Sequence, residues 1–148
     1  MPFRFPLQSI LHFRQSLEHQ QELRLRAANQ QVARARHLIE QIDTRRQELI
    51  AAQSRELGSG LTAAELRFEL RREAELLQHR HELELQLVRL QQLRDQQREI
   101  FRQARRTRET LEAVRNQQLQ VYKQEAARRE QRGLDDLFLL RREYFRRG

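Results

Sequence analysis

The chain has 148 residues, of which 34% are charged and 38% are hydrophobic, and its formal net charge is +8. The dominance of Arg, Gln, Glu and Leu is typical of long helices and coiled coils, and it excludes a thick globular core. The absence of cysteine excludes disulfides, thiolate catalysis and Cys-based metal sites. Such polarity would also fit a disordered chain, and the spacing of the apolar residues decides between the two.

The first expected element is a helix over about residues 6–57. Pro6 can occupy its first turn, where the missing N–H costs nothing, and no proline follows. Apolar residues then recur in alternating steps of three and four, which is the seam of a coiled coil and favours order. The members of this seam are Leu25, Ala28, Val32, Ala35, Ile39, Ile42 and Leu49, with Arg46 as a polar interruption.

The segment LGSGLTAAEL, residues 57–66, predicts a turn over 58–61. Gly58 or Gly60 can take the left-handed conformation that ends a helix. Thr62 is a good N-cap residue, and Glu65 follows it at the spacing of a capping box. A connection this short joins antiparallel neighbours. The predicted fold class is therefore all-α: an antiparallel two-helix coiled-coil hairpin.

A second helix is expected over about 62–132. We expect Gly133 to end or kink it, and a helical extension to follow over 134–147. The whole chain, 1–148, would then be a single coiled-coil domain. The expected seam of the second helix consists of Leu90, Leu93, Ile100, Ala104, Leu111, Val114 and Val121. Before it, a stripe in slightly different register is formed by Leu66, Leu70, Leu77, Leu83 and Leu87.

The two arms are unequal, so the C-terminal arm is predicted to be the longer one. Folding about 59–60 places Leu7 near Glu112 and leaves everything after about residue 116 without a partner in the chain. Apolar residues on such an overhang predict a binding surface. The alternative is a tail that folds back or pairs with a second copy.

No residue pattern points to catalysis or to a bound cofactor. His79 and His81 lie on different helix faces, and His12 and His19 would be roughly 10 Å apart along the axis, too far for one metal ion. Neither a phosphate-binding loop nor a nucleophile motif is present, and a two-helix hairpin offers no dry pocket. We therefore expect a non-enzymatic protein without metal, cofactor or small-molecule substrate.

The positive charge is concentrated in residues 102–148, which hold 13 Arg and Lys against 7 Asp and Glu. Such a segment could meet nucleic acid, anionic lipid or an acidic protein surface. Arg interleaved with Glu and Gln is also ordinary for a solvated helix. Lys123 is the only lysine, and arginines on all sides of the helix argue against nucleic acid as a partner. A shaft or adaptor in a larger assembly fits best, with a basic arm that binds RNA as the alternative.

No apolar run is long enough to span a membrane, and no signal-peptide core follows Met1, so a cytoplasmic location is expected.

Three motifs together resemble the FliJ family. The opening FRFPLQSILHFRQSLE resembles the family's start, and LGSGLTAAEL looks like its Gly-x-Gly hairpin tip. The segment RREQRGLDDL resembles its ending. The three occur in order and cover the whole chain. The matching residues are Phe3, Arg4, Phe5, Leu7, Ile10, Leu11 and Arg14 at the start, and Gln131, Leu134, Asp135, Asp136 and Leu137 at the end.

This resemblance implies a cytoplasmic component of the bacterial flagellar type III export apparatus, similar in fold to the central stalk of rotary ATPases. The implied partners are the hexameric export ATPase, the membrane export-gate protein and export chaperones, so the inner membrane would be reached only peripherally, through partners. The implied role is in flagellum assembly, and hence in motility and chemotaxis. The injectisome stalk family shares this architecture and stays an alternative.

The resemblance also implies two sets of contact residues. The paired N- and C-terminal end would enter the ATPase ring, and one face of the second helix soon after the turn would bind the gate. The ring set is Phe3, Phe5, Arg14, Gln131, Asp135, Asp136, Leu137 and Phe138. The gate set is Phe68, Arg72, Leu76, His79 and Leu83.

Overall fold

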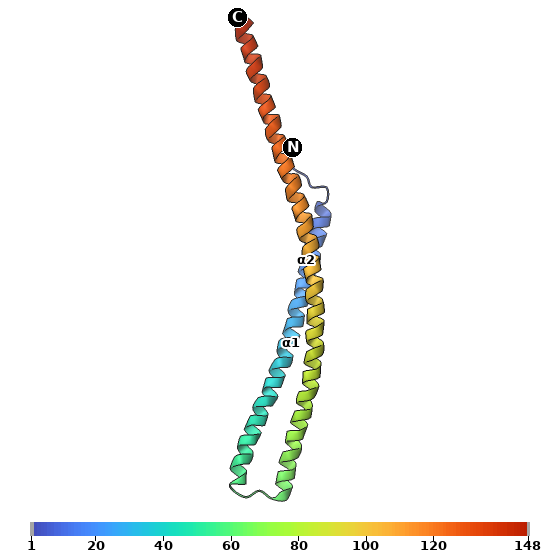
Figure 1. Ribbon diagram of the computed structural model, residues 1–148, viewed down its shortest axis with the longest axis vertical. Helices are drawn as coiled ribbons and strands as arrows, with labels where there is room; N and C mark the ends of the chain where they lie inside the picture. Colours follow the sequence, from blue (N-terminus) through green and yellow to red (C-terminus); the bar gives the residue numbers. More distant parts are fainter. Residues whose placement is uncertain (1, 148) are drawn as a thin grey trace. The chain divides into compact units, whose positions relative to one another are not determined.

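The structure is a computed structural model, and it describes residues 2–147. Two α-helices make up nearly all of this range: α1 spans Gln8–Leu57 and α2 spans Ala63–Arg147. They run in opposite directions from a short connection (Figure 1), and residues 2–147 contain no strand. The predicted all-α, antiparallel two-helix coiled-coil hairpin is therefore confirmed.

Contacts between residues divide the chain into two units. The turn unit is His19–Arg102 and contains the connection between the helices, whereas the terminal unit combines Met1–Glu18 with Gln103–Gly148. Each unit contains a stretch of α1 and a stretch of α2. That the whole chain behaves as a single domain stays a prediction.

Local chemistry explains why these helices are so long. Leu, Arg, Gln and Glu have high helix propensity, and no proline follows Pro6. Pairs four residues apart add to this, because they stack on one helix face. Arg26 lies 2.9 Å from Glu22, and Arg105 lies 3.0 Å from Glu109.

A narrow seam between the helices forms the core of the turn unit. Val32, Ala35 and Ile42 of α1 are buried, as is Leu83 of α2. The remaining α1 positions of the predicted seam are half-buried: Leu25, Ala28, Ile39 and Leu49, together with the polar Arg46. The seam predicted for the first helix is therefore confirmed.

The seam predicted for α2 is confirmed in part. Leu90, Ala104, Leu111 and Val114 are half-buried, whereas Leu93, Ile100 and Val121 are about half exposed, at 56%, 47% and 48%. Other half-buried positions of α2 are 87, 94, 97, 101, 108 and 115. Long polar side chains such as Arg94 and Arg108 occupy several of them, because an arginine stem can cover apolar surface while its guanidinium reaches an acid.

Pairing in the terminal unit extends further along α2 than predicted. The ring centroids of Phe3 and Tyr122 are 5.5 Å apart, and Gln15, rather than Leu7, contacts Glu112. Gln15 is a residue of α1 and lies eight positions after Leu7, so the register between the two helices is shifted relative to the predicted one. With this shift Phe3 reaches Tyr122, beyond the predicted limit near residue 116.

The second helix does not end at Gly133, and residues 134–147, helical as predicted, belong to α2 rather than to a separate extension. α2 continues through Gly133 as far as Arg147, and Gly133 has no positive φ. A glycine inside a helix costs only about 1 kcal/mol, which strong helix formers on both sides can offset.

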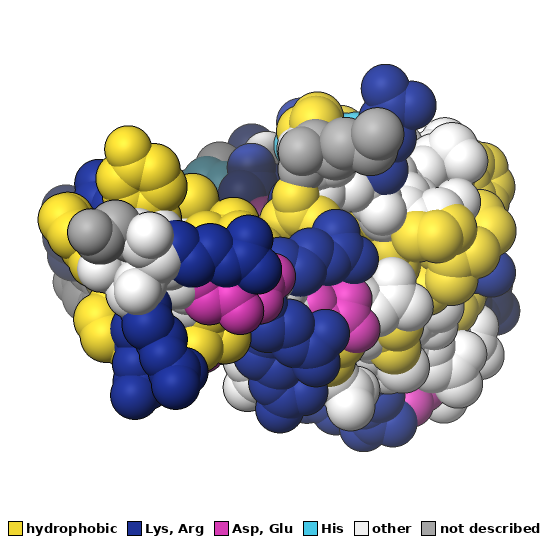
Figure 2. Space-filling model, turned by 90° about the horizontal axis from the view of Figure 1, so that it is seen from above, with side chains coloured by type: hydrophobic (Ala, Val, Ile, Leu, Met, Phe, Trp, Pro, Cys, Tyr) yellow, Lys and Arg dark blue, Asp and Glu magenta, His cyan; other side chains and the backbone are white. Residues whose placement is uncertain are grey.

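We call residues 123–147 the α2 overhang. Every residue in it is exposed, and in Figure 1 this part of the helix continues past the N-terminal segment of the terminal unit. Figure 2, seen from the end at which α2 finishes, shows hydrophobic and basic side chains at the surface. The predicted excess length of the C-terminal arm is thus present.

Candidate partner-binding surfaces

The turn combines one glycine of positive φ with a reciprocal cap. Gly60 has a φ of 86°, the left-handed region that glycine adopts without penalty, whereas Gly58 has no positive φ. The backbone N–H of Glu65 donates to Thr62 Oγ1 at 3.2 Å, and that of Thr62 donates to Glu65 Oε2 at 3.3 Å. These two bonds form a capping box at the start of α2.

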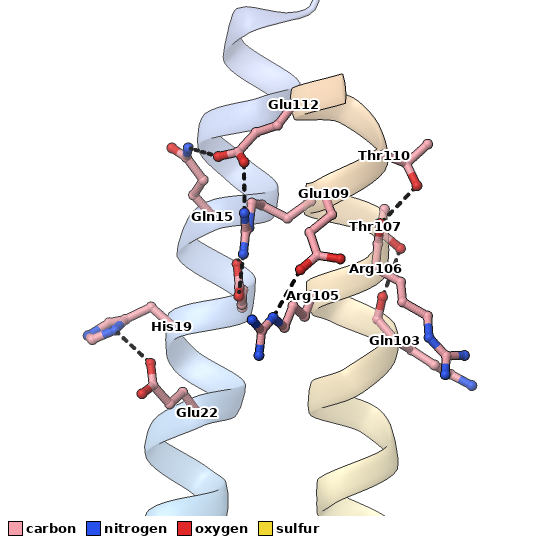
Figure 3. A network of polar contacts seen from close by, with 12 residues as sticks. Gln15, His19, Glu22, Gln103, Arg105, Arg106, Thr107, Glu109, Thr110 and Glu112 are labelled. Carbon is pink, nitrogen blue, oxygen red and sulfur yellow. Dashed lines mark hydrogen bonds and ion pairs between the residues drawn. The ribbon is translucent and has the colours of Figure 1, made fainter. Parts of the chain in front are cut away.

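An ion-pair cluster joins the helices in the terminal unit. Arg108 donates from Nε and Nη2 to the two carboxylate oxygens of Glu18, at 2.6 and 3.1 Å, and from Nη1 to Glu112 at 2.7 Å. Gln15 of α1 reaches the other oxygen of Glu112 at 3.4 Å, as Figure 3 shows. The guanidinium of Arg108 therefore holds one acid from each helix.

This cluster shifts the protonation of its members. The hydrogen bond from Arg108 is the main cause that lowers the pKa of Glu18; burial opposes it, and the charge of Arg108 adds to the lowering. The pKa of Arg108 is raised, chiefly by the hydrogen bond to Glu18. Both groups are therefore charged at neutral pH, and each favours the charged form of the other.

Polar pairs also cross the seam of the turn unit. Arg80 of α2 donates to both oxygens of Asp43 of α1, at 2.7 and 3.3 Å, and lowers the pKa of that carboxyl mainly through the hydrogen bond. Gln97 donates to the side-chain oxygen of Gln21 at 2.7 Å, and Gln21 is the buried polar residue of the seam. Such pairs fix which turn of α1 faces which turn of α2.

The gate set lies in the turn unit but does not form one exposed face. Phe68, Arg72 and His79 are exposed and Leu76 is half-buried. Leu83 is a correction: it is only 7% exposed, because it packs in the seam against α1. Sequence spacing alone could not separate a seam leucine from a surface one.

Three of these residues line a concave surface together with α1. Arg72, Leu76 and His79 face Arg45, Glu48, Leu49 and Ala52 across it. The floor of this groove is apolar and its edges carry both signs of charge. It is therefore a surface on which a protein partner could contact both helices.

The ring set lies in the terminal unit. One half of it belongs to residues 3–14 and the other half to the end of α2. Phe3 is half-buried beside Tyr122, whereas Phe5 is a second correction: at 7% exposed it is a core residue. Arg14 is half-buried, with its guanidinium carbon 5.9 Å from the Phe13 ring centre.

The C-terminal half of the ring set lies on the overhang. Leu137 and Phe138 are 59% and 67% exposed, and Gln131 donates to Asp135 at 3.1 Å. Asp136 is exposed. Residue 131 comes nine positions after Tyr122, which is about 13 Å along a helix, so the two halves do not merge into one compact patch.

Sequence reasoning missed the polar pairs that cross the seam. Glu18, Arg108, Asp43 and Arg80 were not singled out, because charged residues are so frequent in this chain that none stands out. A comparison of opposite charges across the hairpin would have found them, but only with the register that the structure provides.

Two further features bear on the kind of site. Within residues 2–147, no three His, Cys, Asp or Glu side chains lie in position to hold a metal ion together. No helix in the same range is both long and apolar enough to cross a membrane.

The fold defines an all-α coiled-coil protein built from a single helical pair. Residues 3–148 match the family model described as Flagellar FliJ protein, and the chain belongs to this family. It is therefore a component of the flagellar export apparatus, and this family is a non-enzymatic one. Of the flagellar and injectisome stalk families, which the sequence left open, the flagellar family is the one that matches. No curated protein and no solved structure matches the chain.

Proposed function

We propose that this protein physically links the hexameric export ATPase ring to the export-gate protein of the inner membrane, from the cytoplasmic side. Escort of export chaperones belongs to the same proposal, and flagellum assembly, motility and chemotaxis would depend on it. The observation that carries the proposal is the α2 overhang, whose residues are all exposed. Exposed apolar side chains on a helix without a partner favour a binding surface.

The overhang supplies the proposed ring contact. Leu137 and Phe138 offer apolar area, and Gln131, Asp135 and Asp136 offer polar groups beside it. Phe3 and Arg14 would add to the contact from the N-terminal side, where both are half-buried. Phe5 has a supporting role here, since its buried ring holds the segment that carries Phe3.

The turn unit supplies the proposed gate contact. Phe68 is 59% exposed, and the groove beyond it is lined by Arg72, Leu76 and His79. An aromatic side chain that becomes buried on binding, with polar groups around it, is the usual composition of a binding hot spot. Leu83 would then hold the two helices at the spacing that the groove requires.

The arginines between the two helices do not support the RNA-binding alternative. Arg108 and Arg80 are each held by acids of the chain itself, which removes them from a basic surface. No second function is therefore proposed.

Reciprocal phenylalanine variants test the proposal. Phe138→Ser should weaken binding of the purified chain to the export ATPase at least tenfold, and leave gate binding unchanged. Phe68→Ser should do the reverse, so each variant serves as the control for the other. Affinities measured by biolayer interferometry would decide. If Phe138→Ser binds the ring as the parent chain does, the overhang is not the ring contact and the proposal fails.

A further inference from the structure

The last turns of α2, residues 134–147, sort their side chains onto two faces. At about 100° per residue, seven positions fall within an arc of about 160°. Six of them are apolar, and each is more than half exposed. They are Leu134, Leu137, Phe138, Leu140, Tyr144 and Phe145. Arg141 is the seventh, and its long stem can lie along this face while its guanidinium reaches out of it.

The charged residues of this segment are arranged around that arc. On the same helical projection, Arg142 lies about 40° beyond Phe138, and Arg147 lies about 20° beyond Leu140. Glu143 lies on the opposite face, whereas Asp135 and Asp136 lie about 60° and 40° outside the apolar arc, each about 20° beyond an edge arginine. Residues 134–147 hold four Arg against two Asp and one Glu. The residues next to the two edges of the apolar face, Arg142 and Arg147, are thus basic, and the arc itself contains no acidic residue.

Because α2 is continuous, Asp135 and Asp136 do not lie at the start of a helix, where aspartate is commonly found. At the start of a helix they would stabilise its positive end, but α2 runs unbroken through Gly133. Both lie outside the apolar arc, which itself contains no acidic residue. This arrangement is complementary to an anionic surface.

The width of the apolar face also bears on what covers it. A second helix, from another copy or another protein, needs only a narrow stripe of seam positions. An arc of about 160° with three aromatic rings, edged by Arg, is the composition of a helix that lies in a bilayer interface. Arg side chains at the edges extend to lipid phosphates while their stems stay in apolar surroundings.

We propose that residues 134–147 bind the surface of an anionic lipid bilayer as an interfacial amphipathic helix. Leu137 and Phe145 would enter the boundary between headgroups and acyl chains, and Arg142 and Arg147 would contact headgroup phosphates. This goes beyond the proposed link to the export gate, in which the chain reaches the membrane only through a protein. The overhang would then have two alternative occupants, the lipid surface and the ATPase ring.

Vesicle co-sedimentation of the full-length chain tests the inference. Vesicles of phosphatidylglycerol and phosphatidylcholine in equal parts should bind the chain at least tenfold more tightly than phosphatidylcholine alone. Binding should weaken as salt rises, because the anionic surface potential is screened. Equal binding to both vesicle types, or to neither, overturns the proposal.

A pair of leucines on opposite faces gives a matched test. Leu137 lies within the apolar arc, whereas Leu139 lies opposite its centre, and they are 59% and 54% exposed. Leu137→Glu should reduce vesicle binding at least tenfold, and Leu139→Glu should change it less than threefold. The double variant Arg142→Gln, Arg147→Gln should lose about tenfold on anionic vesicles only. Equal far-UV circular dichroism would show that all of these chains are folded.

Sedimentation equilibrium without lipid identifies the competing occupant. If the parent chain dimerises and Leu137→Glu abolishes the dimer but not vesicle binding, the face pairs with a second copy and the lipid proposal is wrong. The vesicle assay contains neither ATPase nor gate protein. Absence of vesicle binding would therefore not decide whether Phe138 contacts the ring, which the ATPase affinity of Phe138→Ser tests separately.

Discussion

The ion pair between Glu18 and Arg108 should contribute measurably to stability, unlike most ion pairs on helix surfaces. Its two side chains are only 17% and 20% exposed, and the contact is bidentate. Exposed pairs contribute about 0.2–1 kcal/mol, whereas breaking a fully buried pair costs about 3–5 kcal/mol. Partial burial with two hydrogen bonds places the expected coupling energy at about 1–2 kcal/mol.

A double-mutant cycle measures this coupling. The variants are Glu18→Gln, Arg108→Gln and the double substitution, each unfolded in urea and followed by far-UV circular dichroism. Since Arg108→Gln also breaks the contact with Glu112, its single effect should exceed that of Glu18→Gln. The cycle removes that extra contribution and leaves only the interaction between Arg108 and Glu18.

The matched control is the pair of Arg105 and Glu109. Both side chains are at least half exposed, at 57% and 50%, and they are four residues apart on α2. Their cycle should give about 0.3–0.5 kcal/mol. If the coupling between Glu18 and Arg108 does not exceed this value, the cluster is an ordinary surface pair and does not hold the two helices in register.

Three further predictions follow from the carboxyl groups and the glycines. The pKa values of Glu18 and Asp43 are lowered in the folded chain, so the stability they contribute is present above the ordinary carboxyl pKa of about 4 and is lost as pH falls through the folded values. The urea midpoint should therefore drop as the pH is lowered from 5 to 3, and Glu18→Gln should show a smaller drop. Gly60→Ala should cost about 1–2 kcal/mol of unfolding free energy, because alanine is strained at a positive φ, and Gly60→Asn should cost less; equal costs would refute the strain argument. Gly133→Ala should raise the helical circular dichroism signal, since an added Cβ at Gly133 meets nothing within 4 Å and alanine favours the helix by about 1 kcal/mol; an unchanged or weaker signal would contradict this.

Local chemistry made the ends of the hairpin turn predictable. The stop at Leu57 and the start at Ala63 follow from glycine, Thr62 and Glu65 within a few residues of each other. The seam of α1 was equally accessible, because Val32 and Ile42 stand among polar neighbours and mark the buried face. Each of these features depends only on residues close together in sequence.

The seam of α2 was not predictable in the same way. Choosing apolar positions selects Leu93 and Ile100, which are exposed, over Arg94 and Arg108, which face α1. Arg108 is stable at such a position because Glu18 of α1 lies opposite it, whereas Arg94 pairs with Asp95 of its own helix. Which residue of α1 lies opposite a given residue of α2 depends on the register between two distant segments. No local sequence pattern in α2 contains this register.

Polar pairs rather than apolar contacts select the register, and in the terminal unit the register decides what remains uncovered. Apolar seam positions repeat every three or four residues, so sliding one helix by a heptad would again oppose apolar residues. The same slide would move Glu18 by about 10 Å along the axis and separate it from Arg108. The pairing of these two residues therefore determines that the N-terminal segment ends its cover at Tyr122. Because α2 continues beyond that point to Arg147, an ion pair far from the overhang sets how many of its apolar residues are left for a partner.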